Sequence, residues 1–371
     1  MPNFDDLKLS VEALSGGKNT VLLDDLGMPS IMVKIPKFKI SDVITGGADT
    51  THPAFIVNGV EKEAIYISKY QNIVMNSRAY SLPHKDPAVY TNFDQAKTYC
   101  EAKGAGWHLM TNAEWAAIAL WCKKNGFMPR GNNYAGADNG AFHEAGVRTY
   151  DWILNYNWNN RAYKIDGSNY YHTGRVATGS GPAAWAHNNS NDGIFDLNGN
   201  VWEWNGGLRL KNGEIQIIPN NDAAQAINQG DTSTLWKAIM PDGSLVDPGT
   251  AGTLKFDYTG APAAGTANFH LTNTLVNQQV DDTPYGTKSF ETITANAGVN
   301  VPAVLKTLGI LPVDASHGGD GFWFRNNGER LPLRGGSFNS GASAGVFALY
   351  LYNERTLSTF TVGFRAAFVN L

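Results

Sequence analysis

Residues 196–204 read Asp-Leu-Asn-Gly-Asn-Val-Trp-Glu-Trp, and this stretch constrains the fold more than any other part of the chain. Its Asn198-Gly199-Asn200 core predicts a turn, because Asn and Gly tolerate the left-handed backbone that tight turns require. On the strand that follows, Trp202 and Trp204 point to the same side and can bury a large apolar area together. The stretch therefore predicts a turn and a short strand belonging to a structural scaffold.

The composition indicates a loop-rich globular protein. Of its 371 residues 43% are hydrophobic and only 17% charged, with a net charge of −4, 40 Gly and 10 Trp. A chain without a basic surplus or a basic run is not typical of a nucleic-acid-binding protein. Its apolar fraction also exceeds that of disordered chains. The excess of Gly and Trp favours a fold of turns packed by aromatic side chains.

The N-terminal sequence and the apolar runs bear on localisation. Residues 1–14 are acidic and lack the apolar segment of a signal peptide. No apolar run approaches the roughly 20 residues of a membrane helix. We therefore expect that the protein has no signal peptide and does not insert into a membrane. We also expect it to be synthesised in a cytoplasm.

Local patterns predict two helices and several strands. Phe93, Ala96 and Cys100 share one helical face within 93–103. Thr111 and Glu114 form a capping box that begins a second helix over 111–125. We expect one strand at 64–70. A second strand is expected at 31–36, at the edge of a sheet, because it ends at a proline. A hairpin is expected over 208–218, with Asn212-Gly213 as its turn.

The two cysteines, Cys100 and Cys122, fall on the two predicted helices. They could form one disulfide or remain two buried thiols. We favour buried thiols, because free cysteine is among the residues most often found in protein cores. Two cysteines cannot build a disulfide framework in a chain of this length.

Five segments, in chain order, resemble the formylglycine-generating-enzyme-like branch of the C-type lectin fold. They read YISKY, PAV with DQAKTYC, WHLMTNAEW, DLNGNVWEW, and LRGGSF with VGFR, at residues 66–70, 87–100, 107–115, 196–204 and 333–365. Met110 and Phe338 depart from the Pro and Trp of the family pattern. The resemblance implies an α+β, loop-rich fold of the formylglycine-generating-enzyme/sulfatase-modifying-factor type, with two helices and short antiparallel strands.

The resemblance also implies a domain organisation. We expect a β-rich attachment or oligomerisation segment at 1–55, followed by a C-type lectin-like domain at 56–371. Within that domain we place an insert at about 206–325 and a variable region at 334–368. The variable region follows from the resemblance, whereas the N-terminal segment and the insert rest on residue position alone.

Catalytic and metal sites find little support in the sequence. Formylglycine-generating enzymes use a cysteine pair in the C-terminal segment, and residues 334–371 contain no Cys. No His pair has metal-ligand spacing. Asp196 could begin a calcium loop, but Val201 and Gly207 occupy the sixth and twelfth positions, where an EF-hand needs Gly and Glu. We therefore expect no enzyme, no cofactor and no EF-hand metal, while a different calcium site in the loops remains open.

Residues 334–368 resemble the variable region of proteins diversified by diversity-generating retroelements. These elements copy a template RNA with errors at adenines, so that Asn codons become codons for other residues. The resemblance implies a ligand-binding surface at Phe338, Asn339, Ser340, Ser343, Tyr350, Tyr352, Asn353, Leu357, Thr359, Phe360 and Thr361. On a strand, Tyr350 and Tyr352 share one face, and Leu349 and Leu351 share the other.

The two resemblances together imply a ligand- or receptor-binding protein, of the kind carried on phage or prophage tails. Its partner would be an unidentified host surface protein or glycan, and it would work on the virion, where receptor binders of this class are often homotrimers. Rigid aromatic side chains such as Tyr350 and Phe360 would anchor the contact. Two alternatives stay open: a catalytic relative of formylglycine-generating enzymes, and a bacterial lectin or adhesin of fixed specificity.

Overall fold

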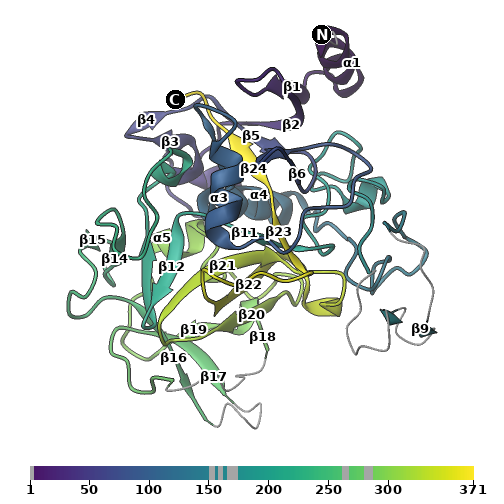
Figure 1. The fold of residues 1–371 in the computed structure, drawn as a ribbon. Helices are drawn as coiled ribbons and strands as arrows, with labels where there is room; N and C mark the ends of the chain where they lie inside the picture. The colour runs from purple at the N-terminus through teal and green to yellow at the C-terminus, as the bar shows by residue number, and fades with distance from the viewer. Residues whose placement is uncertain (1–3, 150–154, 158–161, 165–173, 261–266, 280–286) are drawn as a thin grey trace.

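The chain folds into a strand-rich α+β structure built on two main sheets (Figure 1). The structure, a computed structural model, describes residues 4–149, 155–157, 162–164, 174–260, 267–279 and 287–371. The sequence also predicts long loops packed by their own aromatic side chains around residues 150–171, and most of that stretch lies outside the described residues. The α+β fold class agrees with the prediction. The described residues, however, form five α-helices where two were expected.

The first sheet joins the two ends of the chain. Its strand order is β1-β2-β5-β24-β8, with bounds Asn19–Leu23, Pro29–Pro36, Ala64–Ser68, Ala366–Phe368 and Trp107–Leu109. The yellow C-terminal strand β24 therefore lies among strands from the first third of the chain (Figure 1). β2 is an internal strand paired with β1 and β5, so the prediction of an edge strand at 31–36 was wrong. Because β2 pairs with β5, the sheet continues across the boundary predicted at residue 55.

The second sheet has thirteen strands among the described residues and carries the C-terminal region. Its main path is β18-β20-β22-β21-β12-β13-β16-β17-β19, with bounds Lys288–Ser289, Gly321–Phe324, Gly345–Asn353, Glu329–Gly335, Leu208–Lys211, Glu214–Ile217, Lys255–Thr259, Asn268–Thr272 and Thr294–Ala295. Strands β11, β14, β15 and β23 attach to it, at Trp202–Trp204, Lys237–Ile239, Leu245–Val246 and Val362–Phe364. The pairs β11/β23, β17/β19 and β20/β22 are parallel, so the expected all-antiparallel arrangement was only partly right.

Three short hairpins complete the strands. They pair β3 with β4, β6 with β7 and β9 with β10, at Ile56–Val57 and Val60–Glu61, Ile73–Met75 and Arg78–Tyr80, and Asn155–Asn157 and Ala162–Lys164. The predicted hairpin at 208–218 is confirmed as β12/β13. Its turn residues Asn212 and Gly213 have φ of 48° and 82°, the left-handed pair of a type I′ turn.

The helices lie between and around the sheets. The α-helices α1 to α5 span Phe4–Ser15, Ile40–Val43, Phe93–Glu101, Asn112–Asn125 and Ala303–Thr307. Short 3-10 helices η1, η2, η3, η5 and η6 span Pro53–Phe55, Ala183–Trp185, Asp222–Ala224, Phe290–Thr292 and Gly341–Ser343. The predicted capping box is confirmed, because the Thr111 side chain accepts from the Glu114 N–H and α4 ends at Gly126 with φ of 71°. Both cysteines are buried free thiols.

Strand β11 confirms the scaffold role predicted for residues 196–204. It pairs with β21 on one side and β23 on the other, and Trp204 is completely buried. The turn before it uses Gly199 and Asn200 at φ of 83° and 62°. One core cluster contains both tryptophans together with residues of α3 and of both sheets. The stretch thus joins the two sheets at the centre of the molecule.

Candidate ligand-binding surface

We call the predicted ligand-binding positions slots. Strand β22, an internal strand of the second sheet, carries three of them: Tyr350, Tyr352 and Asn353. It lies between β21, to which it runs antiparallel, and β20, to which it runs parallel. Leu349 and Leu351 are completely buried, whereas Tyr350 and Tyr352 are partly exposed. The alternation predicted from the sequence is therefore confirmed.

The two tyrosines belong to an aromatic stack. The Tyr350 ring lies parallel to that of Tyr352, with centroids 5.3 Å apart, and stacks at 5.2 Å on Trp202. Trp323 of β20 meets Tyr350 edge to face at 5.1 Å. The Arg325 guanidinium lies 3.7 Å from the centre of the Tyr352 ring. Burial in this stack raises the pKa of Tyr350 to about 12, so its hydroxyl stays protonated.

Main-chain hydrogen bonds hold the slots at 359–361. The Thr359 carbonyl accepts from the Tyr90 N–H at 3.0 Å, and the Thr361 carbonyl accepts from the Trp202 N–H at 2.8 Å. The Phe360 carbonyl accepts from the Arg175 guanidinium at 3.3 Å. None of these three bonds uses the slot's own side chain. The side chains at these three positions can therefore change without loss of these contacts.

Arg355 stabilises the start of the loop that carries slots 359–361. Its guanidinium donates to Asp94 at 2.6 Å, to Glu329 at 3.0 Å and to the Gln229 carbonyl at 2.8 Å. These partners come from α3, from β21 and from the loop before β14. The loop at 354–361 is thus held from three sides by a residue that is not itself a predicted slot.

Leu357 lies in the loop at 354–361, and the other four slots lie between β21 and β22. Asn339 is exposed, and Ser340 and Ser343 are partly exposed. Phe338 differs, because it is 1% exposed and its ring occupies the space where a side chain on Gly174 would lie. The Phe338 backbone is also bonded at both N–H and carbonyl, to Asn200 and Ala135. In this structure Phe338 is an interior residue and does not contribute exposed surface.

We define the variable face as the surface formed by the ten other slots, each of which is exposed or partly exposed: Asn339, Ser340, Ser343, Tyr350, Tyr352, Asn353, Leu357, Thr359, Phe360 and Thr361. Sequence reasoning missed the side chains that support this face, above all Trp323, Arg325 and Arg355. Trp323 and Arg325 become neighbours of Tyr350 and Tyr352 only because β20 pairs in parallel with β22.

The framework beneath the variable face is fixed by buried polar contacts. The Trp115 indole N–H of α4 donates to the Val346 carbonyl at 2.7 Å, and Asp320 accepts from the Phe347 N–H at 2.7 Å. Gly345 is required where β22 begins, since a Cβ there would lie 2.0 Å from an Asp320 oxygen. These contacts hold β22 in place independently of the slots.

The described residues offer no group of three or more His, Cys, Asp or Glu placed to hold a metal ion. Burial raises the pKa of both thiols, Cys100 and Cys122, well above the usual range. Neither is therefore a thiolate at neutral pH. In the part of the chain that is described, no helix has both the length and the apolar character to cross a bilayer.

Comparisons with known proteins give a family and a structural likeness. Residues 11–225 match the family described as the sulfatase-modifying factor enzyme 1-like domain. No curated protein matches the chain. Among solved structures, the chain is similar to Treponema denticola variable protein 1, with a TM-score of 0.33 and 12% identity, over 95% of this chain and 99% of that one.

Proposed function

Because the chain belongs to the sulfatase-modifying factor enzyme 1-like domain family, we propose that it uses this fold as a rigid scaffold for a diversified ligand-binding surface. The ligand would contact the variable face. Residues 334–368 would be the segment that a diversity-generating retroelement rewrites. Tyr350, Tyr352 and Phe360 would provide the aromatic contacts, and Asn339, Ser340 and Ser343 the polar ones.

This proposal rests on a difference in burial, because the ten slots of the variable face are exposed or partly exposed, whereas the framework residues next to them are buried. Between the partly exposed slots, Val346 to Leu349, Leu351 and Val362 to Arg365 are all buried. The loop slots are held by main-chain bonds, which any side chain permits. A surface that must accept many sequences needs such a division, because a binding site works only on a scaffold that does not move when the site changes.

A catalytic role is the alternative that the family description favours. The chemistry of that branch needs a reactive thiolate, and both thiols here are buried on α3 and α4. We therefore propose a binding protein and not an enzyme. A lectin or adhesin of fixed specificity would use the same surface, and the experiment below separates it from a diversified one.

As the setting we propose a phage or prophage tail, with the variable face turned toward a protein or glycan of the host surface. The resemblance of residues 334–368 to a retroelement-diversified variable region motivates this choice. The protein would assemble in the cytoplasm and then work on the virion.

The decisive experiment sequences the DNA that flanks the gene. We expect a reverse-transcriptase gene and a near-copy of the segment that encodes residues 334–368. Differences between the two copies should fall at adenines of the template and alter the ten positions of the variable face. Codons for buried framework residues such as Phe347 and Phe364 serve as the internal control and should be identical.

Flanking DNA that holds neither a reverse transcriptase nor a near-copy would refute diversification and leave the fixed-specificity lectin. Differences spread equally over framework codons would refute it as well, since random drift produces that pattern.

A further inference from the structure

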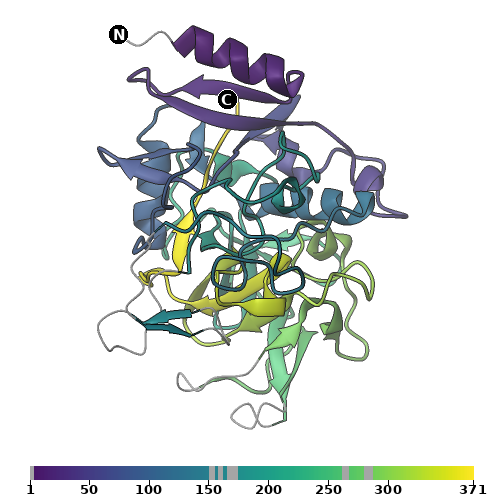
Figure 2. The ribbon, with the colours of Figure 1, turned by 90° about the vertical axis from the view of Figure 1, so that its right-hand side faces the viewer.

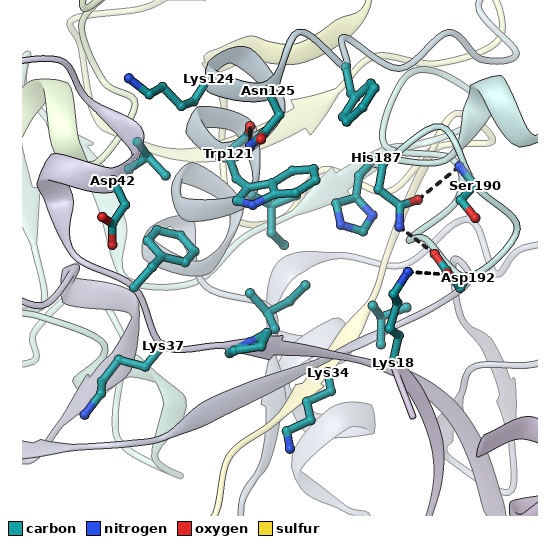
Figure 3. A pocket seen from close by; sticks show the side chains of 18 of the residues that line it. Lys18, Lys34, Lys37, Asp42, Trp121, Lys124, Asn125, His187, Ser190 and Asp192 are labelled. Carbon is teal, nitrogen blue, oxygen red and sulfur yellow. Dashed lines mark hydrogen bonds and ion pairs between the residues drawn. The ribbon is translucent and has the colours of Figure 1, made fainter. Parts of the chain in front are cut away.

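A groove of about 920 Å³ opens far from the variable face, beside β2 and the C-terminal end of α4 (Figure 3). Its floor is apolar and includes Val33, Ile118 and the partly exposed rings of Phe38 and Trp121. Phe127, at 38% exposure, lines it as well. An open apolar surface with several aromatic rings is typical of a surface that a partner covers.

The groove has a basic rim. Lys18, Lys34, Lys37 and Lys124 line it, against the two carboxylates Asp42 and Asp192. Lys18 and Lys37 are already paired with carboxylates, Lys18 with Asp192 at 2.9 Å. Among the described residues, neither Lys34 nor Lys124 has a carboxylate within ion-pair distance. The groove is therefore suited to an apolar partner that carries negative charge.

Helix α1 has the complementary surface. It lies on the outside of β1, at the periphery of the molecule (Figure 2). Leu9 and Leu14 are 68% and 91% exposed. The helix contains three acidic residues, Asp5, Asp6 and Glu12, and one lysine, Lys8. An exposed surface that combines leucines with a net negative charge matches an apolar groove in which two lysines lack a carboxylate partner.

Helix α1 is held against its own strand. Thr20 of β1 donates to the Glu12 carboxylate at 2.6 Å, and the Ser15 hydroxyl accepts from the Asn19 N–H at 2.9 Å. Its outward leucines therefore stay exposed within one copy. Five large exposed hydrophobic side chains gather in this part of the chain: Leu9, Leu14, Leu23, Leu26 and Met28. Such a concentration on one edge indicates an interface.

We propose that α1 of one copy docks in the groove of a second copy of this chain. Leu9 and Leu14 would cover Trp121 and Phe38, and the acidic residues of α1 would approach Lys34 and Lys124. Gly16, Gly17 and Lys18 follow α1 directly and line the groove of the same copy. Helix and groove are thus neighbours on one molecule, so two copies related by a two-fold axis can each place α1, still packed on its own β1, in the other copy's groove.

The test measures the molar mass of the full chain by size-exclusion chromatography with light scattering. We expect the wild type to associate, and both Leu9→Glu/Leu14→Glu and Lys34→Glu/Lys124→Glu to run as monomers. The matched control is Leu245→Glu/Val276→Glu, which places the same charges at exposed apolar positions elsewhere and should associate as the wild type does. Circular dichroism checks that each variant is folded.

A mixture of the helix variant and the groove variant provides a second test. The helix variant keeps an intact groove, and the groove variant keeps an intact helix, so their mixture can form one of the two contacts. We expect the mixture to associate more than either variant alone. A pair and a ring of three both satisfy the proposal, because both bury α1 in a neighbour's groove.

Three results would overturn the proposal. They are a wild type that is monomeric at every concentration, association that only one of the two variants abolishes, and a mixture that behaves as its separate components do. Loss of association in the helix variant alone would indicate a contact between two α1 helices.

Discussion

At the scale of single residues, the buried pair Arg365–Glu203 connects the second sheet, through Glu203 of β11, to the first sheet, through Ser68 of β5. The guanidinium donates two bonds of 2.6 Å to the carboxylate and one bond of 3.0 Å each to the carbonyls of Ser68 and Phe195. Both side chains are completely buried. Arginine can satisfy this set because its donors are fixed in a plane.

We predict that Arg365→Met destabilises the protein by about 3–5 kcal/mol, because it leaves the Glu203 carboxylate buried without a partner. Urea unfolding measures the loss. The double variant Arg365→Met/Glu203→Gln should recover part of it, since no charge then remains buried. An exposed pair is the comparison: Lys39→Met, which breaks the contact with Asp49, should leave the midpoint unchanged.

Tyr350 is both a slot and part of the packing. Replacement by alanine should cost about 1–3 kcal/mol, because it removes a ring stacked between Trp202 and Tyr352. Tyr350→Phe keeps the ring and should unfold at nearly the wild-type urea concentration. An equal loss in both variants would mean that the hydroxyl, and not the stack, supplies the stability.

From the sequence, the five fixed donors of Arg365 indicated that it could bind loop carbonyls or a carboxylate such as that of Glu203. The sequence also indicated that Tyr350 would be a surface residue, but not that Trp202 would stack on it. That contact depends on the positions of β11 and β22 within one sheet. No local pattern encodes such a position, since the two strands are distant in the chain.

At the scale of elements, His52 connects η1 with α5. Its Nδ1 accepts from the Ala54 N–H at 3.2 Å and its Nε2 lies 3.1 Å from the Thr307 carbonyl, so the ring is neutral. Burial lowers the pKa of His52 to about 4. The sequence analysis assigned no role to this histidine, because its partner lies on a helix near the other end of the chain.

This burial predicts a pH dependence. In the unfolded chain a histidine binds a proton below about pH 6.5, whereas folded His52 does so only near pH 4. The unfolded state therefore gains protons first as the pH falls, and stability decreases between about pH 6.5 and 4. Between pH 7.5 and pH 5, we expect the free energy of unfolding of His52→Gln to fall by about 2 kcal/mol less than that of the wild type. Urea unfolding at both pH values measures this difference. Equal losses in the two proteins would contradict the assignment.

At the scale of the whole molecule, residues 206–325 are part of the scaffold. They supply most strands of the second sheet, and β20 pairs directly with the slot-bearing β22. The sequence predicts an insert at about 206–325, but not the pairing of β20 with β22. Its segments are rich in Ala, Gly and Thr, so their pairing could not be predicted from hydrophobic periodicity.

If stability resides in the framework, several slots can change together at little cost. We predict that the fourfold variant Asn339→Tyr, Ser343→Asp, Asn353→Ser and Thr359→His stays within about 1–2 kcal/mol of the wild type, as surface substitutions do. Phe347→Ala, one buried change in the same segment, should cost about 3–5 kcal/mol. Urea unfolding of the three proteins measures both values. A fourfold variant as unstable as Phe347→Ala would mean that these four slots contribute as much to folding as a core residue, which contradicts the proposed division between slots and framework.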